Sequence, residues 1–568
     1  MLLILLSWAY IFAITLVFGV SVKRVLKLKK LEYIITLFLG FFIITLFTGF
    51  WAICFSVNRS FHFVLLALTI ILFIYNKHLV KQELLDLKES LKKLTPFLKG
   101  ILIALSLFIL AQCASPPFVI DNESYYIQTI KWLNEYGFVK GLVNLHLFLG
   151  QTSGWHILQS AFNFSFIYPN FNDLSGFCLL LGNIYAIIKL SDYVISSKAK
   201  AFNLIIGLFP IFNVFLFQFI SAPSPDIAVY VLGLILFHQF VMCHTVYKRN
   251  TFITIALLSL FVVLIKLTAV ILLLLPLILV FKYKTKVKKE VLSIIIFGAL
   301  AFSLFIIKNI IITGNAIYPL NSIDLLTTNW SLPKSIEEYF SNYSKSYGYG
   351  LTFEAYENAS LFSRLKSWLF ISPIDAVFNL GMIILLLVSP LFIKLLKNRK
   401  ALFNIYALAV LNLLLLFATS PQYRFFFLFF MMLSLIIIAS VFKEKKAIYT
   451  LITISTLLST IPLFYNVKNS SLTNTAYHNK SSSFSIDYLF KPCGNSKYNE
   501  TYKPVTVENT TINTPSEIDF FWATGNIPLP ALNEQQFDYF ETYFNVIPQQ
   551  RGETLKDGFC SKTINRDE

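Results

Sequence analysis

Apolar runs about as long as a membrane-spanning helix recur through most of the chain. They extend from Leu2 to Tyr465 and are rich in Phe, Ile and Leu. A helix of about 20 apolar residues crosses the hydrocarbon core of a bilayer. The composition agrees, with 56% hydrophobic residues, 14% charged residues and a mean hydropathy of +0.67, and it excludes a soluble globular protein. We therefore predict an all-α polytopic membrane protein.

Positive charges in this part gather in short clusters between the apolar runs. Basic residues in short loops mark the cytoplasmic side of a membrane protein. The net charge of +17 therefore encodes orientation and does not indicate nucleic-acid binding. The first run, Leu2 to Val20, has its charges after it and no small-residue cleavage site, which predicts a retained span. The clusters predicted to face the cytoplasm are Lys23–Lys30, Lys77–Lys99, Lys198–Lys200, Lys248–Arg249, Lys282–Lys289, Lys394–Lys400 and Lys443–Lys446.

The segment from Thr251 to Phe281 breaks the simple count of spans. It is apolar throughout but has basic clusters at both ends. We predict two half-spans of about 15 residues that meet near Lys266, each too short to cross the core alone. A break at this depth is tolerated where protein or a wet cavity covers it. The full spans are predicted at Leu2–Val20, Tyr33–Ser56, Phe61–Tyr75, Gly100–Ala114, Leu174–Leu190, Ala201–Ile220, Asp226–Tyr247, Val291–Thr313, Ile371–Ile393, Ala401–Thr419, Phe425–Phe442 and Ala447–Tyr465.

Residues 1–465 thus form about 14 helical segments, with both termini and two large loops, residues 115–173 and 314–370, on the outer face. The first loop contains a predicted helix from Ser124 to Tyr136, which Asp121 or Asn122 can cap and Gly137 ends. We expect this helix to lie on the membrane surface, held by aromatic anchors. The stretch from Leu142 to Tyr168 is too polar for a span and predicts surface or re-entrant packing. The expected anchors are Tyr125, Tyr126 and Trp132.

The tail, residues 466–568, loses the span pattern and gains Asn, Ser, Thr and Pro. We predict a small extracytoplasmic α+β domain there. Lys503 to Ile512 alternates like a strand, and Glu534 to Phe544 has the pattern of a helix. Its two cysteines, Cys493 and Cys560, are interpreted as a disulfide, with two unpaired thiols as the alternative.

Seven ionisable residues are predicted near the outer membrane surface, where a charge usually marks a site. Opposite charges at one depth suit a substrate with an anionic phosphate and a hydroxyl that must lose its proton. The acids also have structural interpretations as helix caps or solvated carboxylates. Lys266 and Arg424 could instead snorkel to the interface. His146 and His156 have an alternative interpretation as packing or capping residues with no role in a site. The candidates are Asp121 and Glu123 for catalysis, and His146, Asp226, Lys266, Lys308 and Arg424 for substrate binding.

The acidic pair after an early span, followed by a helix with Tyr and Trp, resembles the first periplasmic loop of GT-C glycosyltransferases. The segments SAPSPDIA, LIKLTA, KNIIITGNAIYP and SPQYRF occur in this order and resemble bacterial polysaccharide-locus membrane proteins of GT-C-like architecture. The resemblance covers about Gly100 to Phe442. In GT-C enzymes a first-loop carboxylate acts as the base or as a metal ligand, which would carry over to Asp121 or Glu123.

We therefore predict a glycosyltransferase that moves a sugar from a polyprenyl-phosphate donor to a glycan or lipid acceptor. It would work at the outer face of the bacterial cytoplasmic membrane. The sequence identifies no certain cofactor, and whether the enzyme uses a divalent metal ion is left open. A polysaccharide polymerase or ligase usually has a late loop rich in arginine, and residues 314–370 contain Arg364 alone. A lipid-linked-glycan transporter or flippase would also use charges at broken helices, but no repeated halves are visible. A non-catalytic scaffold is the remaining alternative.

Overall fold

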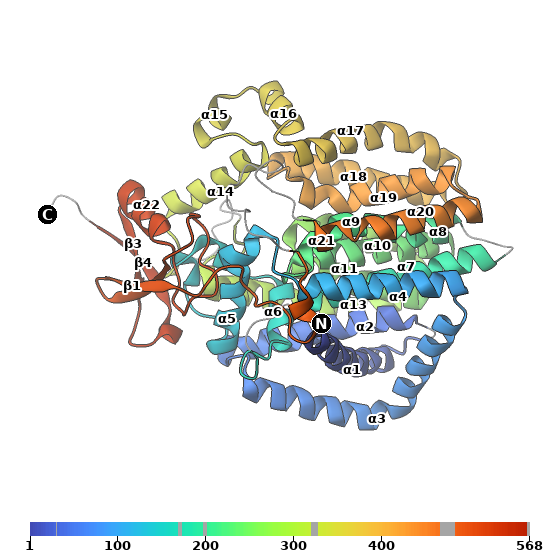
Figure 1. Cartoon of the computed structure of the whole chain (residues 1–568), viewed down its shortest axis with the longest axis horizontal. Coiled ribbons are helices and arrows are strands. Elements are labelled where there is room, and N and C mark those ends of the chain that lie inside the picture. The colour runs from blue at the N-terminus through green and yellow to red at the C-terminus, as the bar shows by residue number, and fades with distance from the viewer. Residues whose placement is uncertain (30, 169–172, 197–200, 320–327, 466–482, 565–568) are drawn as a thin grey trace.

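The computed structural model describes residues 1–29, 31–168, 173–196, 201–319, 328–465 and 483–564. Long helices form a bundle, and the C-terminal strands lie beyond one end of it (Figure 1). The described parts of loops 115–173 and 314–370 lie toward that same end, which we call the loop end. The opposite end is called the basic end, because lysine and arginine clusters meet there.

Twelve of the described helices are long and apolar enough to cross a membrane. A helix pairs its own backbone groups, so such runs can sit in hydrocarbon without unsatisfied polar atoms. The predicted multi-pass all-α architecture is confirmed at this level. The helices are α1 (Leu2–Val25), α2 (Tyr33–Cys54), α3 (Arg59–Lys92), α4 (Pro96–Ala114), α7 (Leu174–Ile195), the segment Ala201–Phe219 that begins with α8 (Ala201–Gly207), α10 (Pro225–Thr245), α13 (Lys284–Thr313), α17 (Pro373–Lys394), α18 (Arg399–Ala418), α19 (Tyr423–Val441), and α20 with α21 (Lys445–Phe464).

The segment between α10 and α13 is broken where the sequence predicts. Lys266 has an extended backbone (φ −151°, ψ 118°), which ends one helix and precedes a 3-10 helix. The far end of the segment returns to the end of α10, since Lys282 Nζ donates to the carbonyl of His244 (2.6 Å). At its near end, Arg249 Nε donates to Glu290 of α13 (2.9 Å). The two half-spans therefore form a hairpin of α11 (Arg249–Ile265), η6 (Leu267–Leu273) and α12 (Leu274–Lys282).

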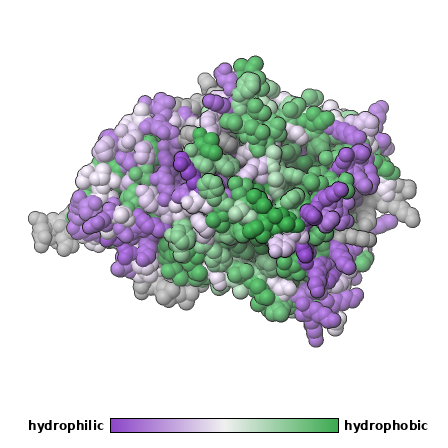
Figure 2. All heavy atoms as spheres, turned by 90° about the horizontal axis from the view of Figure 1, so that it is seen from below, coloured by the Kyte–Doolittle hydropathy of each residue, from purple (hydrophilic) through white to green (hydrophobic). Residues whose placement is uncertain are grey.

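Basic clusters that are far apart in sequence lie together at the basic end. Arg249 donates to the carbonyl of Leu26 (3.2 Å), and the Tyr193 hydroxyl donates to the carbonyl of Lys443 (3.4 Å). Figure 2 shows a broad hydrophobic belt between two hydrophilic ends. This arrangement is that of a membrane protein with one basic side, whereas the cytoplasmic location of that side stays a prediction. The cluster Lys198–Lys200 lies outside the described residues.

Cysteines placed at the basic end should be protected from an impermeant thiol reagent in intact cells. We expect Lys286→Cys and Lys397→Cys to react only after lysis, because the hairpin returns both positions to the basic end, which is predicted to face the cytoplasm. Tyr543→Cys, on an exposed side chain of the tail, should react in intact cells. The measurement is a maleimide mass shift, in a background where Cys54, Cys493 and Cys560 are Ser. Labelling of position 286 or 397 in intact cells would exclude this topology.

The first loop is packed inside the protein rather than on a membrane surface. It forms the π-helix η1 (Asn122–Tyr126), α5 (Ile127–Glu135), the 3-10 turns η2 (Leu142–Asn144) and η3 (Leu147–Gln151), and α6 (Gly154–Ala161). The predicted helix is confirmed, and Gly137 follows it with a positive φ of 72°. The expected interfacial anchors are wrong, because Tyr126 and Trp132 are each 1% exposed and Tyr125 is 9% exposed. The tail covers this loop, so its aromatic residues fill a protein core.

The second loop and the tail meet through aromatic residues at the loop end. Phe340 of α14 belongs to a small hydrophobic cluster that also contains Trp522 and Phe540 of the tail. The second loop forms α14 (Lys334–Gly348), α15 (Phe353–Asn358) and α16 (Leu361–Leu369). The described tail forms η9 (Ile486–Leu489), β1 (Tyr502–Val507) paired with β2 (Thr510–Pro515), α22 (Glu534–Phe544), and β3 (Val546–Gln550) paired with β4 (Phe559–Thr563), both pairs antiparallel.

The tail contains the predicted helix Glu534–Phe544, but its first strand is different. Lys503 to Ile512 is two strands of a hairpin, because Glu508 takes a positive φ of 50° and turns the chain. The disulfide interpretation is also wrong, since Cys493 and Cys560 are free. Cys493 is held by its N–H to the carbonyl of Ala114 (2.9 Å), whereas Cys560 sits in the β3–β4 pair. Residues 466–482 of the predicted domain lie outside the described part.

Candidate functional site

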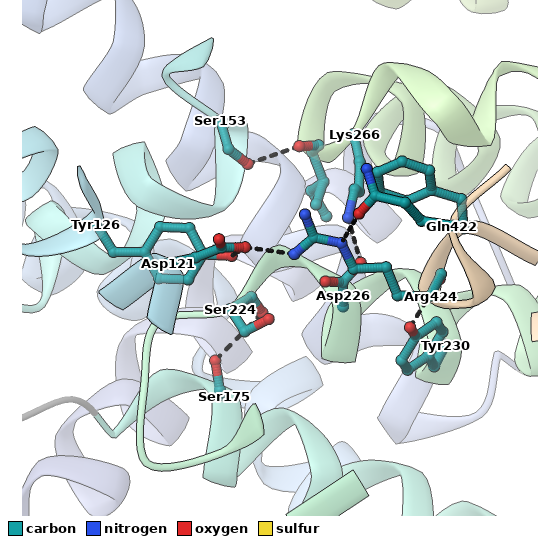
Figure 3. A network of polar contacts seen from close by, with 12 residues as sticks. Asp121, Tyr126, Ser153, Ser175, Ser224, Asp226, Tyr230, Lys266, Gln422 and Arg424 are labelled. Carbon is teal, nitrogen blue, oxygen red and sulfur yellow. Dashed lines mark hydrogen bonds and ion pairs between the residues drawn. The ribbon is translucent and has the colours of Figure 1, made fainter. Parts of the chain in front are cut away.

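Four charged side chains from four separate segments meet at the loop end of the bundle (Figure 3). Asp121 precedes η1, Asp226 lies in the first turn of α10, Lys266 lies at the break after α11, and Arg424 lies in the first turn of α19. We call these four residues the charged cluster. Their signs alternate and their formal charges sum to zero, which lowers the cost of holding four charges close to hydrocarbon.

Asp121 and Arg424 form the half of the charged cluster that is nearer the first loop. Arg424 pairs with Oδ2 of Asp121, and its Nε donates to the side-chain oxygen of Gln422 (2.9 Å). The Tyr126 hydroxyl also donates to Oδ2 of Asp121 (3.4 Å). Within the described part of the chain, no group donates to Oδ1 of Asp121, and this side chain makes no cap to its own helix. One carboxylate oxygen therefore remains available to accept a proton.

Asp226 and Lys266 form the deeper half of the charged cluster. Lys266 pairs with Oδ1 of Asp226, and its ammonium lies 4.6 Å from the ring centroid of Phe425. Asp226 is 1% exposed, and its Oδ2 is buried without a hydrogen-bond partner. Lys266 also interacts electrostatically with Arg424 and Asp121. The two ion pairs therefore form one electrostatic unit, and removing any member leaves another charge poorly compensated.

The backbone around Lys266 is held by α6 of the first loop. The break exposes the carbonyl of Ile265, which accepts a hydrogen bond from the Ser153 hydroxyl (2.6 Å). Gly154 follows, and a Cβ there would lie 2.8 Å from the carbonyl oxygen of Leu264. Buried backbone groups need partners, and only glycine permits this approach. Ser153 and Gly154 thus stabilise the break and fix the position of Lys266.

A narrow cavity of about 10 Å³, the room of a single water molecule, adjoins the charged cluster. Asp226, Lys266 and Arg424 line it, with Asn412 and Phe425. It contains both signs of charge, which suits the separation of a proton from a leaving group. A ligand larger than water must displace side chains to enter.

The remaining candidates predicted from the sequence lie elsewhere. Lys308 is 5% exposed and its Nζ donates to the carbonyl of Thr152 (2.8 Å), beneath the first loop. Glu123 is fully buried and faces the tail, where it accepts from the Ser496 hydroxyl (2.7 Å) and from the N–H of Lys497 (2.9 Å). Burial raises the pKa of the Glu123 carboxyl. The structure thus joins Glu123 to tail docking and does not bring it into the charged cluster.

His146 also lies at the contact between the first loop and the tail. Its Nδ1 accepts from the N–H of Phe148 (3.2 Å), so the neutral ring must carry its proton on Nε2, which lies 2.9 Å from the carbonyl of Trp522. Burial lowers the pKa of His146 to about 4. A protonated ring would place a second N–H against that of Phe148. His146 is therefore a neutral docking residue that lies apart from the charged cluster.

Mild acid should loosen the tail. The pKa of His146 with the tail docked lies below the ordinary 6.5. The docked state therefore binds fewer protons than a state in which the tail has separated from the first loop. The neutral His146 ring contributes its full free energy of docking the tail above about pH 6.5, and this contribution falls as the pH drops toward about 4. About 2 kcal/mol of it is lost at about pH 5. We expect lower protection factors at residues 520–524 at about pH 5 than at about pH 7.5, measured by amide exchange after correction for the intrinsic pH dependence of the exchange rate.

His146→Gln can still donate to the Trp522 carbonyl and should remove the loosening in acid. Only the opposite effect of Glu123 should then remain, because its raised pKa favours the docked tail as the pH falls. The control is His78→Gln on an exposed histidine of α3, which should keep the wild-type profile. Equal protection factors of the wild type at both pH values would contradict the docking role of His146.

The structure adds His156 to the surroundings of the charged cluster. Its Nε2 is buried without a hydrogen-bond partner, and its ring centroid lies 4.7 Å from that of Tyr126, the residue bound to Asp121. Its Nδ1 accepts from the N–H of Ser153 (3.4 Å), which is the capping role considered for it. The sequence signal was the polar stretch Gln151–Ser153 just before it. That signal could not show which charged residues the ring faces.

The charged cluster offers two carboxylates to a divalent metal ion, and substrate or water would have to supply the other ligands. Among the described residues, no three or more His, Cys, Asp or Glu side chains are grouped to hold a metal. Asp121 and Asp226 are each engaged by a cationic side chain, and Glu123 faces the tail. The metal-ligand role that the resemblance allows for Asp121 or Glu123 stays a prediction.

Comparison with known proteins gives one family match. The model of a family described as "Domain of unknown function (DUF8201)" matches residues 1–431. The match includes all four residues of the charged cluster and ends within α19. No curated protein and no solved structure matches the chain.

Proposed function

The chain belongs to the family of the domain of unknown function DUF8201, and we propose that it is a membrane glycosyltransferase of the GT-C kind. It would transfer a sugar from a polyprenyl-phosphate donor to a glycan or lipid acceptor in the outer leaflet of the bacterial cytoplasmic membrane. One observation carries the proposal: Asp121 and Asp226 alternate with Arg424 and Lys266 at the loop ends of the spans. A base and two cations at one depth match the demands of this reaction.

The two cations supply the site for the donor phosphate. The guanidinium of Arg424 can bind two phosphate oxygens in a fork, and the ammonium of Lys266 adds a point charge. The cavity beside them is narrow, so the phosphate would have to displace Asp121 from Arg424. Donor binding would then release the carboxylate that the next step requires.

Asp121 is the proposed general base. The acceptor hydroxyl gives its proton to Asp121 while its oxygen forms a bond to the anomeric carbon of the donor sugar. The bond from that carbon to the phosphate oxygen breaks, and its electron pair stays on the phosphate. Arg424 and Lys266 stabilise the negative charge that develops there. Asp226 touches neither reactant in this scheme and positions Lys266.

The depth of the charged cluster suits a lipid-anchored donor. Asp226 and Arg424 lie in the first turns of two apolar helices, and Lys266 lies between two half-spans. A polyprenyl phosphate has its head group at this level of a bilayer while its chain stays in hydrocarbon. The donor can therefore reach both cations without leaving the membrane.

A transfer assay separates this proposal from its rivals. The full chain would be placed in liposomes that contain polyprenyl-phosphate-linked donors with labelled sugars and a mixture of glycan and lipid acceptors. We expect label to appear on an acceptor, together with free polyprenyl phosphate. Movement of the intact donor between leaflets without cleavage would instead establish the transporter alternative. Absence of both cleavage and movement across a broad donor panel would leave the scaffold alternative standing.

A further inference from the structure

A second polar cavity, of about 680 Å³, lies at the basic end of the bundle. Its volume falls within the usual range for small-molecule sites. The walls come from the loop before α2, the ends of α7 and α10, the start of α8 and the start of α11. Asp226 and Gln239 lie thirteen residues apart on α10, so the two sites are separated by about 20 Å at 1.5 Å per residue.

The floor of this cavity is formed by half-buried Asn203 and by buried His238 and Gln239, which are hydrogen-bonded to one another or to buried Tyr185 behind them. The Tyr185 hydroxyl lies 2.6 Å from Nδ1 of His238, and Nε2 of His238 lies 3.2 Å from the side-chain oxygen of Asn203. Nε2 of Gln239 donates to the Tyr185 hydroxyl (2.9 Å). No described residue bonds to the Asn203 amide nitrogen or the Gln239 amide oxygen. The floor therefore offers one donor and one acceptor, which is what a hydroxyl-bearing ligand needs.

The walls and the mouth of the cavity carry an excess of positive charge. Lys189, 8% exposed, pairs with Glu32 (2.8 Å). Lys29 and Lys248 are exposed at the mouth, and neither pairs with a carboxylate of a described residue. Two unpaired cations above a neutral, hydrogen-bonding floor favour an anion that also carries hydroxyl groups.

We propose that this cavity binds a hydroxyl-bearing phosphate ester at the basic end of the protein. The phosphate would lie between Lys29 and Lys248, and the hydroxyl groups would meet Asn203 and Gln239. Such an ester is either a soluble sugar phosphate or the head group of a phospholipid, and the two share the same recognition chemistry. The site is separate from the charged cluster and does not depend on the transferase proposal.

Binding can be measured on the full chain in phosphatidylcholine nanodiscs. One arm titrates glucose 1-phosphate by calorimetry, and the other adds dioctanoyl phosphatidylglycerol and counts bound molecules by native mass spectrometry. The test variant is Lys29→Gln with Lys248→Gln, which changes only exposed side chains. The matched control is Lys88→Gln with Lys92→Gln, two exposed lysines of α3 that remove the same charge outside the cavity.

We expect the test variant to bind at least tenfold more weakly than the wild type, equivalent to about 1.4 kcal/mol, and the control to bind like the wild type. Gln239→Leu should reduce the preference for glucose 1-phosphate over inorganic phosphate, because it removes the hydroxyl partner. Response in the first arm identifies a soluble ester, and response in the second arm alone identifies a lipid head group. Binding of neither probe, or equal weakening by the test and control variants, would overturn the proposal.

Discussion

Asp121→Asn should lower sugar transfer by about 10² or more, the usual scale for loss of general-base catalysis. Asparagine keeps the size of the side chain and can still accept hydrogen bonds from Arg424 and Tyr126 at its amide oxygen. It cannot take the proton of the acceptor. The amount of folded protein in the membrane should therefore stay near that of the wild type. Initial rates of labelled-sugar transfer, divided by the amount of folded protein, measure the effect.

The structure removes one competing explanation of such a loss. Asp121 makes no hydrogen bond to the start of its own helix, so the substitution does not act by removing a cap. Glu135→Gln is the matched control, because Glu135 is an exposed carboxylate of the same loop. It should transfer sugar like the wild type. A fully active Asp121→Asn protein would refute the role of Asp121 as the base.

Lys266→Met should cost about 3–5 kcal/mol of stability, the usual result of leaving one partner of a buried ion pair unpaired. Asp226 is 1% exposed, and one of its oxygens already has no hydrogen-bond partner. Adding Asp226→Asn to Lys266→Met removes the uncompensated charge and should restore most of the lost stability. Thermal unfolding in detergent measures each step.

The same series separates stability from phosphate binding. Transfer should stay low in the restored double variant, because the ammonium that faces the donor phosphate is still missing. Arg424→Met should likewise weaken use of the lipid phosphate. The control is Lys308→Met, a buried lysine bound to a backbone carbonyl, whose defect Asp226→Asn should not repair. Wild-type stability of Lys266→Met would show that Asp226 and Lys266 do not depend on each other.

Part of the charged cluster could be predicted from sequence, because charge in an apolar chain is rare. Asp226, Lys266 and Arg424 stand out against their neighbours, and counting basic clusters places them at one membrane face. Their pairing could not be predicted in the same way. Asp121 and Arg424 are separated by 303 positions, and no feature of the sequence near either residue indicates that the two form a pair. The catalytic and binding roles of all seven candidates remain predictions.

Glu123 and His146 show the opposite case. Local pattern placed both beside the site, yet they bind Lys497 and Trp522 of the tail. The aromatic residues of the first loop were expected at the lipid interface for the same reason. The sequence shows that a side chain is amphipathic, but it does not show whether lipid or a distant segment of the chain covers that side chain.

The sequence by itself determined the spans, the break at Lys266 and the helix Glu534–Phe544. Each depends on hydropathy, periodicity or charge within one short segment, and a bilayer or a helix responds directly to those properties. Only the tertiary structure decided which carboxylate meets which cation, that the tail covers the first loop, and that His156 faces Tyr126. Those contacts join segments far apart in the chain, and they form because packing and the cost of an unpaired buried charge act on the whole fold at once.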